Sequence, residues 1–197
     1  MAKEAKRRPK TSAPPDRIEC DARLVRPAAE AGGRPPTWSF LVLPAAASKR
    51  LPSRGMVSVE GTFAGVAFAA TLNPDGKGSH WLKVEAALRK AAKKDHGDDV
   101  ALAFAPVTEE PEPTIPAPFK AALAAAPPKA RETWDDITPA ARRDFVQWIE
   151  SAKLADTRTK RVATACDMLA KGKRRPCCFD RSGIYGKNLS CPTEATD

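Results

Sequence analysis

The chain has 197 residues, enough for one large domain or two small ones, and it carries 19 prolines and a net charge of +9. The first residues are basic but no apolar run follows them, and no segment approaches the ~20 apolar residues of a membrane span. The sequence therefore predicts a soluble cytoplasmic protein without a secretory signal, and its five cysteines are expected to be free thiols.

The N-terminal half has the pattern of a small β-barrel. Residues 1–15 are charged and lack periodicity, which predicts a disordered basic tail, and residues 16–107 are expected to form the barrel. Its first strand alternates apolar Ile18, Cys20, Ala22 and Leu24 with charged residues. Similar runs occur at residues 37–43, 56–63, 66–72, 80–84 and 100–104. Six short strands favour a closed barrel because closure removes exposed edges, and one short helix is expected to end before Gly97.

The C-terminal half is expected to be helical, which gives an α+β chain. Residues 108–117 form a proline-rich acidic linker, because closely spaced prolines prevent a helix. Residues 118–175 predict a helical module with helices at residues 121–126 and 128–136, a third helix capped by Thr138, and a fourth from about Asp156 to Gly172. The last two are expected to form an antiparallel hairpin, and residues 176–197 a C-terminal tail.

Two segments carry a family resemblance. The stretch IPAPFKAALAA, the helix around Trp134, TPAARRDFVQWIESAK and DTRTKRVATACDMLAKGKRRP together resemble the YdeI/OmpD-associated family. The stretches LPSRGMVSVEGTFAGVAF, GSHWLKV, ALRKA and GDDVAL resemble the barrel called domain of unknown function 1905. The resemblance covers roughly residues 17–175. It implies links of some members to outer-membrane partners and to resistance against cationic antimicrobial peptides, with no established catalytic residues.

The start of the last helix holds the main candidate site. Arg158, Lys160 and Arg161 occupy its first turn, where positive charge opposes the helix dipole, so the arginines need a partner. One alternative is a structural salt bridge to Asp144 or Glu150 of the preceding helix. The other is an anion site, in which Thr157, Arg158 and Arg161 of the TR-x-x-R element bind a phosphate or carboxylate.

A second candidate site lies in the barrel. Arg54 follows a Pro-Ser turn, and His80, Trp81 and Lys83 open a strand after a glycine-containing loop. An aromatic side chain beside polar groups is typical of a ligand pocket at a barrel mouth. The alternative is that His80 lies on the surface and that Trp81 belongs to the core.

Catalysis and metal binding find little support in the sequence. No GxSxG elbow, P-loop or dinucleotide fingerprint is present, so we expect no enzyme activity, although Cys-His chemistry stays open. Adjacent Cys177 and Cys178, with Cys191 nearby, lack the spacing of a zinc site, and we expect no metal or cofactor. A redox role for the pair stays open, since neighbouring cations lower thiol pKa values.

The leading hypothesis is a non-enzymatic bacterial binding protein in stress or antimicrobial-peptide resistance. Its partner would be a small anionic ligand or a protein. The alternative is nucleic-acid binding by the basic tail and the helical module. The stretch from Arg142 to Lys187 contains twelve cationic residues and five carboxylates, so it would attract phosphates. The oligomeric state is not predicted.

Overall fold

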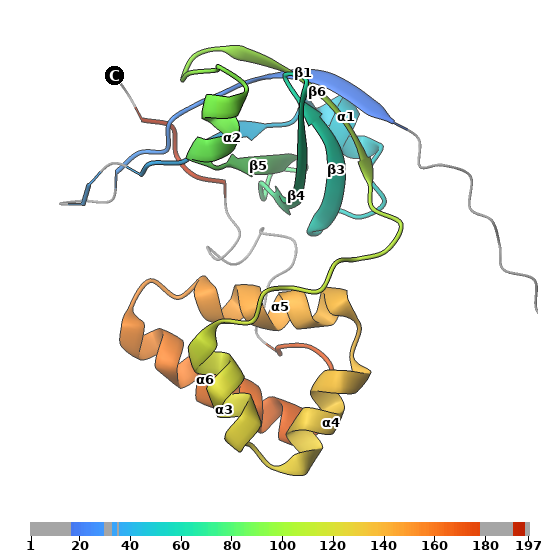
Figure 1. The fold of residues 1–197 in the computed structure, drawn as a ribbon, viewed down its shortest axis with the longest axis vertical. Helices are drawn as coiled ribbons and strands as arrows, with labels where there is room; N and C mark the ends of the chain where they lie inside the picture. The colour runs from blue at the N-terminus through green and yellow to red at the C-terminus, as the bar shows by residue number, and fades with distance from the viewer. Residues whose placement is uncertain (1–16, 30–32, 35, 178–190, 196–197) are drawn as a thin grey trace, which may run out of the picture.

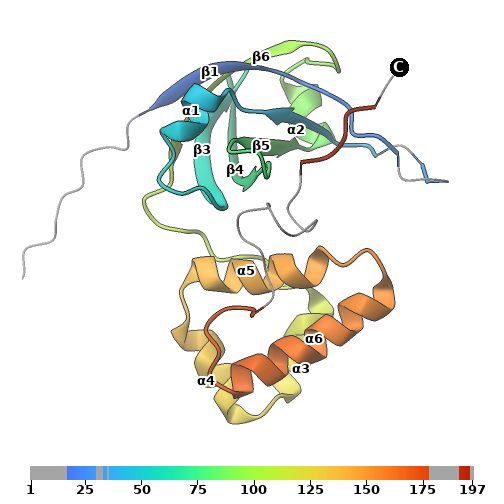
Figure 2. The same cartoon turned by 180° about the vertical axis from the view of Figure 1, so that it is seen from behind.

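The computed structural model describes residues 17–29, 33–34, 36–177 and 191–195, and it consists of a β-barrel and a helical module (Figure 1). The views in Figures 1 and 2 both show helix α5 (Pro139–Glu150) on the side of the helical module that faces the barrel. The tail expected at residues 1–15 lies outside the described residues.

All six predicted strands are confirmed. They are β1 (Ile18–Arg23), β2 (Ser39–Val42), β3 (Val57–Phe63), β4 (Val66–Pro74), β5 (His80–Val84) and β6 (Asp99–Pro106). They form one antiparallel sheet in the order β1-β6-β3-β4-β5-β2. The chain after β1 then meets β2, because Val25 and Phe40 exchange backbone hydrogen bonds of 2.8 and 3.0 Å. This bridge nearly closes the barrel.

The barrel interior follows from the alternation of the strands. Inward side chains such as Ile18, Val59, Phe63, Leu82 and Phe104 are almost fully buried and form one core. Strands β3 and β6 approach closely at Gly61, where an added Cβ would lie 2.1 Å from the carbonyl oxygen of Ala103. Only glycine allows this approach.

Two short helices cover the barrel, whereas the sequence predicted one. Helix α2 (Ala86–Ala91) lies at the expected place, and it ends at Ala91. Helix α1 (Ala45–Lys49) was not predicted, because five residues are too few to show a helical period. It buries Ala47 and Ser48 against the barrel.

Four helices make up the C-terminal module: α3 (Ala117–Ala125), α4 (Pro128–Asp136), α5 and α6 (Ala155–Ala170). Helix α3 begins at Ala117 rather than Ala121, because Pro118 fits the first turn of a helix. The Thr138 side chain accepts a hydrogen bond from the Ala141 amide and caps α5, as predicted. Helix α6 turns back from α5, and the two diverge from their connecting turn in both views (Figures 1 and 2).

One polar cluster joins the two halves of the chain. Arg143 of α5 donates to the Ser58 hydroxyl of β3 at 2.9 Å, and it forms an ion pair with Glu110 of the linker. The Ser58 hydroxyl also donates to Glu110 at 2.5 Å. Because the Arg143 and Glu110 side chains are only 12% and 22% exposed, water screens this ion pair less than a surface pair.

Candidate functional site

The first turn of α6 lies against the last turn of α5, and this geometry determines what its arginines do. Only four residues, 151–154, separate the two helices. The last carbonyl groups of a helix have no partner within the helix and form the negative end of its dipole. Arg158 donates through Nη1 to the carbonyl oxygens of Ala152 and Lys153, at 2.8 and 3.0 Å.

Arg161 makes the same kind of contact one turn further along α6. Its Nη1 donates to the carbonyl oxygen of Trp148 and, at 2.9 Å, to the hydroxyl of Ser151. The guanidinium also lies over the Trp148 ring, 5.3 Å from the ring centroid. Arg161 therefore binds a carbonyl in the last turn of α5, whereas Arg158 binds carbonyls of the connecting residues that follow it.

The sequence suggested Asp144 as a carboxylate partner for the arginines of α6, but Asp144 pairs with a different arginine. Asp144 is fully buried, and it forms an ion pair with Arg175, which follows α6. The expected salt bridge from α6 to Asp144 is therefore replaced by bonds to backbone carbonyls. The bonds to backbone carbonyls are compatible with anion binding by the same arginines, because these bonds involve only the Nη1 groups of Arg158 and Arg161.

A largely apolar groove lies beside Arg158. It has a volume of about 670 Å³ and runs between α3 and the corner formed by α5 and α6. Its apolar lining comes from Pro116, Pro118, Ala122, Ile149, Ala155, Val162 and Ala163, and its polar lining from Glu150, Arg158 and Thr159. We refer to it as the α3/α6 groove. Thr157 and Arg161 are not among the lining residues.

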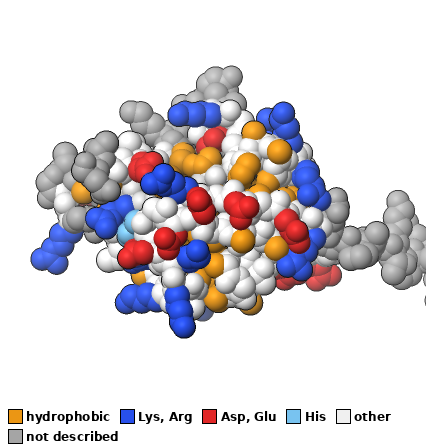
Figure 3. All heavy atoms as spheres, turned by 90° about the horizontal axis from the view of Figure 1, so that it is seen from above, with side chains coloured by type: hydrophobic (Ala, Val, Ile, Leu, Met, Phe, Trp, Pro, Cys, Tyr) orange, Lys and Arg blue, Asp and Glu red, His pale blue; other side chains and the backbone are white. Residues whose placement is uncertain are grey.

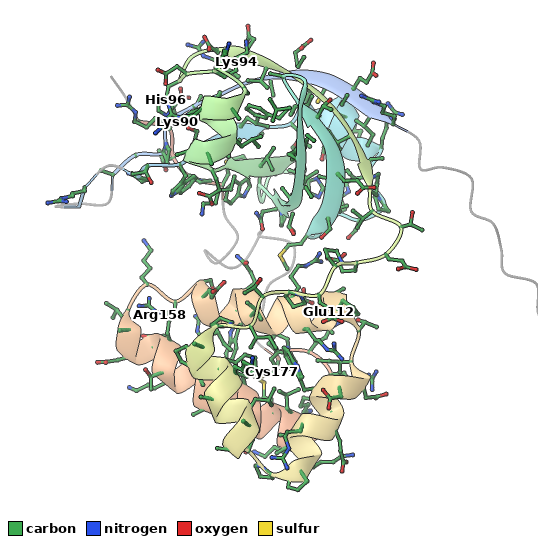
Figure 4. All side chains as sticks on the ribbon, in the orientation of Figure 1. Lys90, Lys94, His96, Glu112, Arg158 and Cys177 are labelled. Carbon is green, nitrogen blue, oxygen red and sulfur yellow. The ribbon has the colours of Figure 1, made fainter. Side chains whose placement is uncertain are left out.

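The arrangement at the groove suits a ligand with an apolar body and a polar end. Arg158 is exposed and projects from the first turn of α6 (Figure 4). Its stem is apolar and its guanidinium presents several N–H donors in one plane. Glu150 supplies acceptor oxygens to the same groove.

The barrel candidates do not form one pocket. His80 points into the barrel and is 1% exposed, so the surface alternative is wrong. Its Nε2 donates to the Gly55 carbonyl oxygen at 2.9 Å, and its Nδ1 accepts from the Ser48 hydroxyl at 2.6 Å. Burial lowers the pKa of His80, which favours the neutral ring. His80 thus connects β5, α1 and the loop at residue 55.

Trp81 and Lys83 lie on the opposite face of β5, because adjacent strand residues alternate. Trp81 is buried in a small outer cluster with Phe40, at a ring-centroid distance of 6.3 Å. Lys83 lies 5.3 Å from the centroid of the Trp38 ring. Arg54 is exposed and borders a separate cavity of about 230 Å³ beside α1.

The cysteines are spread over both halves. Cys177 is exposed, and its thiol lies 3.6 Å from the sulfur of Met168 (Figure 4). Cys178 lies outside the described residues. Cys191 packs beside the outer aromatic cluster of the barrel. Across the described ranges, no group of three His, Cys, Asp or Glu side chains is placed to hold a metal ion.

Several cations of the helical module are already paired with carboxylates. Arg142 pairs with Glu112, Arg174 with Asp136, and Lys171 with Asp167. A paired cation attracts a nucleic-acid phosphate less strongly, since its own carboxylate competes. Nucleic-acid binding stays a prediction, and the basic tail on which it depends lies outside the described residues.

Comparison with known proteins identifies both halves. A family model described as "Bacteriocin-protection, YdeI or OmpD-Associated" matches residues 112–172, which include α3–α6 and the α3/α6 groove. The helical module is thus similar to the YdeI/OmpD-associated family over residues 112–172. A second model, described as "Domain of unknown function (DUF1905)", matches residues 21–103 of the barrel. Both resemblances inferred from the sequence motifs are confirmed.

No curated protein matches the chain. Within the part of the chain that the structure describes, no helix is both long and apolar enough to span a membrane.

Proposed function

We propose that this protein is a non-enzymatic binding protein that contributes to protection against bacteriocins, and that the α3/α6 groove is its ligand site. The family description supports the protective role. The observation that carries the site is the groove itself: an apolar space of about 670 Å³ with Arg158, a residue of the TR-x-x-R element, in its lining.

The groove selects the chemical class of ligand. Seven apolar residues line it, whereas Glu150 and Arg158 are the charged residues in its lining. An apolar side chain beside a carboxylate and an N–H group would satisfy all three features. The apolar side chain would enter the groove, the carboxylate would accept from Arg158, and the N–H would donate to Glu150. The C-terminal residue of a peptide has this chemistry, and bacteriocins are peptides or proteins.

N-acetyl-leucine is a small probe with all three features. We expect it to shift the amide signals of residues that line the groove in heteronuclear NMR spectra of the full chain. N-acetyl-leucinamide lacks the carboxylate, and acetate lacks the apolar body, so both should bind at least several-fold more weakly. Equal shifts by all three probes, or shifts confined to the barrel, would overturn the assignment of the groove.

Three variants distinguish binding in the groove from a general effect of surface charge. Ala163→Trp places a large side chain at an exposed position of the lining and should abolish the shifts without disturbing the core. Arg158→Met keeps much of the apolar stem and should weaken N-acetyl-leucine and acetate, which have a carboxylate, but not N-acetyl-leucinamide. Lys160→Met is the matched control, because Lys160 is a neighbouring exposed cation outside the lining. If Lys160→Met weakens binding as much as Arg158→Met, the proposed role of Arg158 is wrong.

A further inference from the structure

The described residues of the C-terminal tail do not extend away from the molecule; residues 191–195 lie against the barrel. We call them the C-terminal segment. Ala28 donates its amide to the Thr193 carbonyl oxygen at 2.8 Å, and Ala195 donates to the Arg26 carbonyl oxygen at 2.9 Å. Pro27 and Glu194 face each other across this antiparallel bridge. Both ribbon views show the segment beside the chain that leaves β1 (Figures 1 and 2).

One side of the C-terminal segment contacts an aromatic cluster on the outer face of the barrel. The cluster consists of Trp38, Phe40 and Trp81, with neighbouring ring centroids 6.3–6.4 Å apart. Cys191 packs against this cluster and is half-buried there. Burial raises the pKa of the Cys191 thiol to about 11, which reflects its poor access to water.

Further along the segment, Glu194 borders a polar cavity. The cavity has a volume of about 220 Å³ and is also lined by Arg23, Arg26, Asp95 and His96. The ring of His96 is held at 2.9 Å from the Ser39 hydroxyl and 3.4 Å from Nη2 of Arg26 (Figure 4). Figure 3 shows the mixed cationic and acidic surface of this side of the barrel. Two arginines in the lining favour a carboxylate at the position of Glu194.

These contacts have the three parts of an extended-peptide site: a strand edge, an apolar pocket and a charged pocket. In such sites the main chain gives affinity, and pockets for particular side chains give specificity. We propose that the edge at residues 26–28 is a peptide-binding site, which residues 191–195 occupy. A partner would present an extended segment with a small apolar residue three positions before a carboxylate, as Cys191 precedes Glu194.

The occupied site is suited to exchange. Strand β1 pairs with β6 over six residues, whereas the C-terminal segment is held by two backbone hydrogen bonds and the packing of a few side chains. A segment of the same chain still competes well, because its binding is intramolecular and its effective concentration exceeds that of a dilute free peptide. A partner peptide therefore has to bind tightly or be abundant to replace it.

A competition experiment tests the proposal. The probe is a fluorescently labelled peptide with the sequence LSCPTEATD, which is that of residues 189–197. We expect fluorescence anisotropy to show binding to a chain truncated after residue 190, and at least tenfold weaker binding to the full chain. A probe with lysine in place of the glutamate, and the variant Arg23→Glu, should each reduce binding to the truncated chain. Lys49→Glu on α1 is the matched charge control and should leave it unchanged.

A second measurement uses the full chain and does not depend on the folding of the truncated one. Excess unlabelled peptide with alanine in place of its cysteine should raise the rate of Cys191 alkylation severalfold, while a scrambled peptide should not. The proposal is overturned if the folded, truncated chain does not bind the probe. It is equally overturned if the peptide leaves Cys191 alkylation in the full chain unchanged.

Discussion

Replacing Arg161 by alanine tests the conclusion that this arginine stabilises the end of α5. The change removes the charged donor to the Trp148 carbonyl oxygen, the 2.9 Å bond to Ser151 and the contact with the Trp148 ring, and it leaves the Ser151 hydroxyl as a donor to that carbonyl at 3.0 Å. The Trp148 carbonyl then loses a charged donor at a helix end where no later amide replaces it.

The expected cost follows from these contacts. A hydrogen bond from a charged group contributes about 1.5–3 kcal/mol, and a partly exposed cation–π contact about 0.5–1 kcal/mol. Arg161 is half-buried, so solvent reduces both contributions. We expect Arg161→Ala to lower the free energy of unfolding of the helical module by about 2–3 kcal/mol. Arg161→Lys should recover about half of the loss, because one ammonium group cannot reproduce the planar guanidinium.

Urea unfolding followed by tryptophan fluorescence measures this free energy through Trp134 and Trp148 of the helical module, in a variant background in which Trp38 and Trp81 of the barrel are replaced by phenylalanine. Lys160→Ala is the control: it removes an exposed cation from the same turn and should change stability by less than about 0.5 kcal/mol. If Arg161→Ala and Lys160→Ala are equally stable, the arginine does not stabilise the helix end and the reasoning is refuted.

Three further predictions concern the barrel and its junction with the helices. Gly61→Ala should destabilise the barrel by more than about 3 kcal/mol in urea unfolding, because the new Cβ would overlap backbone atoms of β6. His80 should make stability fall as the pH drops below about 6.5, since burial lowers its pKa and the unfolded chain then binds the proton more readily; the slope is at most about 1.4 kcal/mol per pH unit. Arg143→Ala should increase the radius of gyration in small-angle X-ray scattering, because it removes the cluster with Ser58 and Glu110.

The first two of these predictions have a matched control variant. Gly65→Ala introduces strain at φ +82° but no contact within 4 Å, so its cost should be about 1–2 kcal/mol. His80→Gln should flatten the stability profile between pH 5 and 7 more than His96→Gln, because His80 is almost fully buried. An unchanged radius of gyration in Arg143→Ala would show that other contacts hold the barrel and the helices together.

The barrel strands were predictable because they are short apolar runs separated by turn residues, with clear alternation in β1 and β6. Helix α1 was not, because Pro44 and three alanines show neither period nor amphipathic character. The same alternation separates His80 from Trp81, and this was the available signal that the four barrel candidates could not share a pocket.

The arginines of α6 were identified from the sequence, but their partner was not. Charge and position showed that Arg158 and Arg161 oppose the dipole of their own helix. The short connection at residues 151–154 also places them beside the negative end of α5, which is a local signal that could have been used. The α3/α6 groove could not be predicted, because its lining joins Pro116 to Val162 through packing that no local pattern records.

The C-terminal segment is synthesised after the rest of the described chain, so it can cover the barrel only at the end of synthesis. During synthesis β6 leaves the ribosome first, the four helices follow, and residues 191–195 emerge after them. The tryptophan-rich outer face of the barrel therefore stays exposed to solvent while the helices are synthesised. A nascent chain halted at the end of α6 would present that face to chaperones, whereas the released chain covers it.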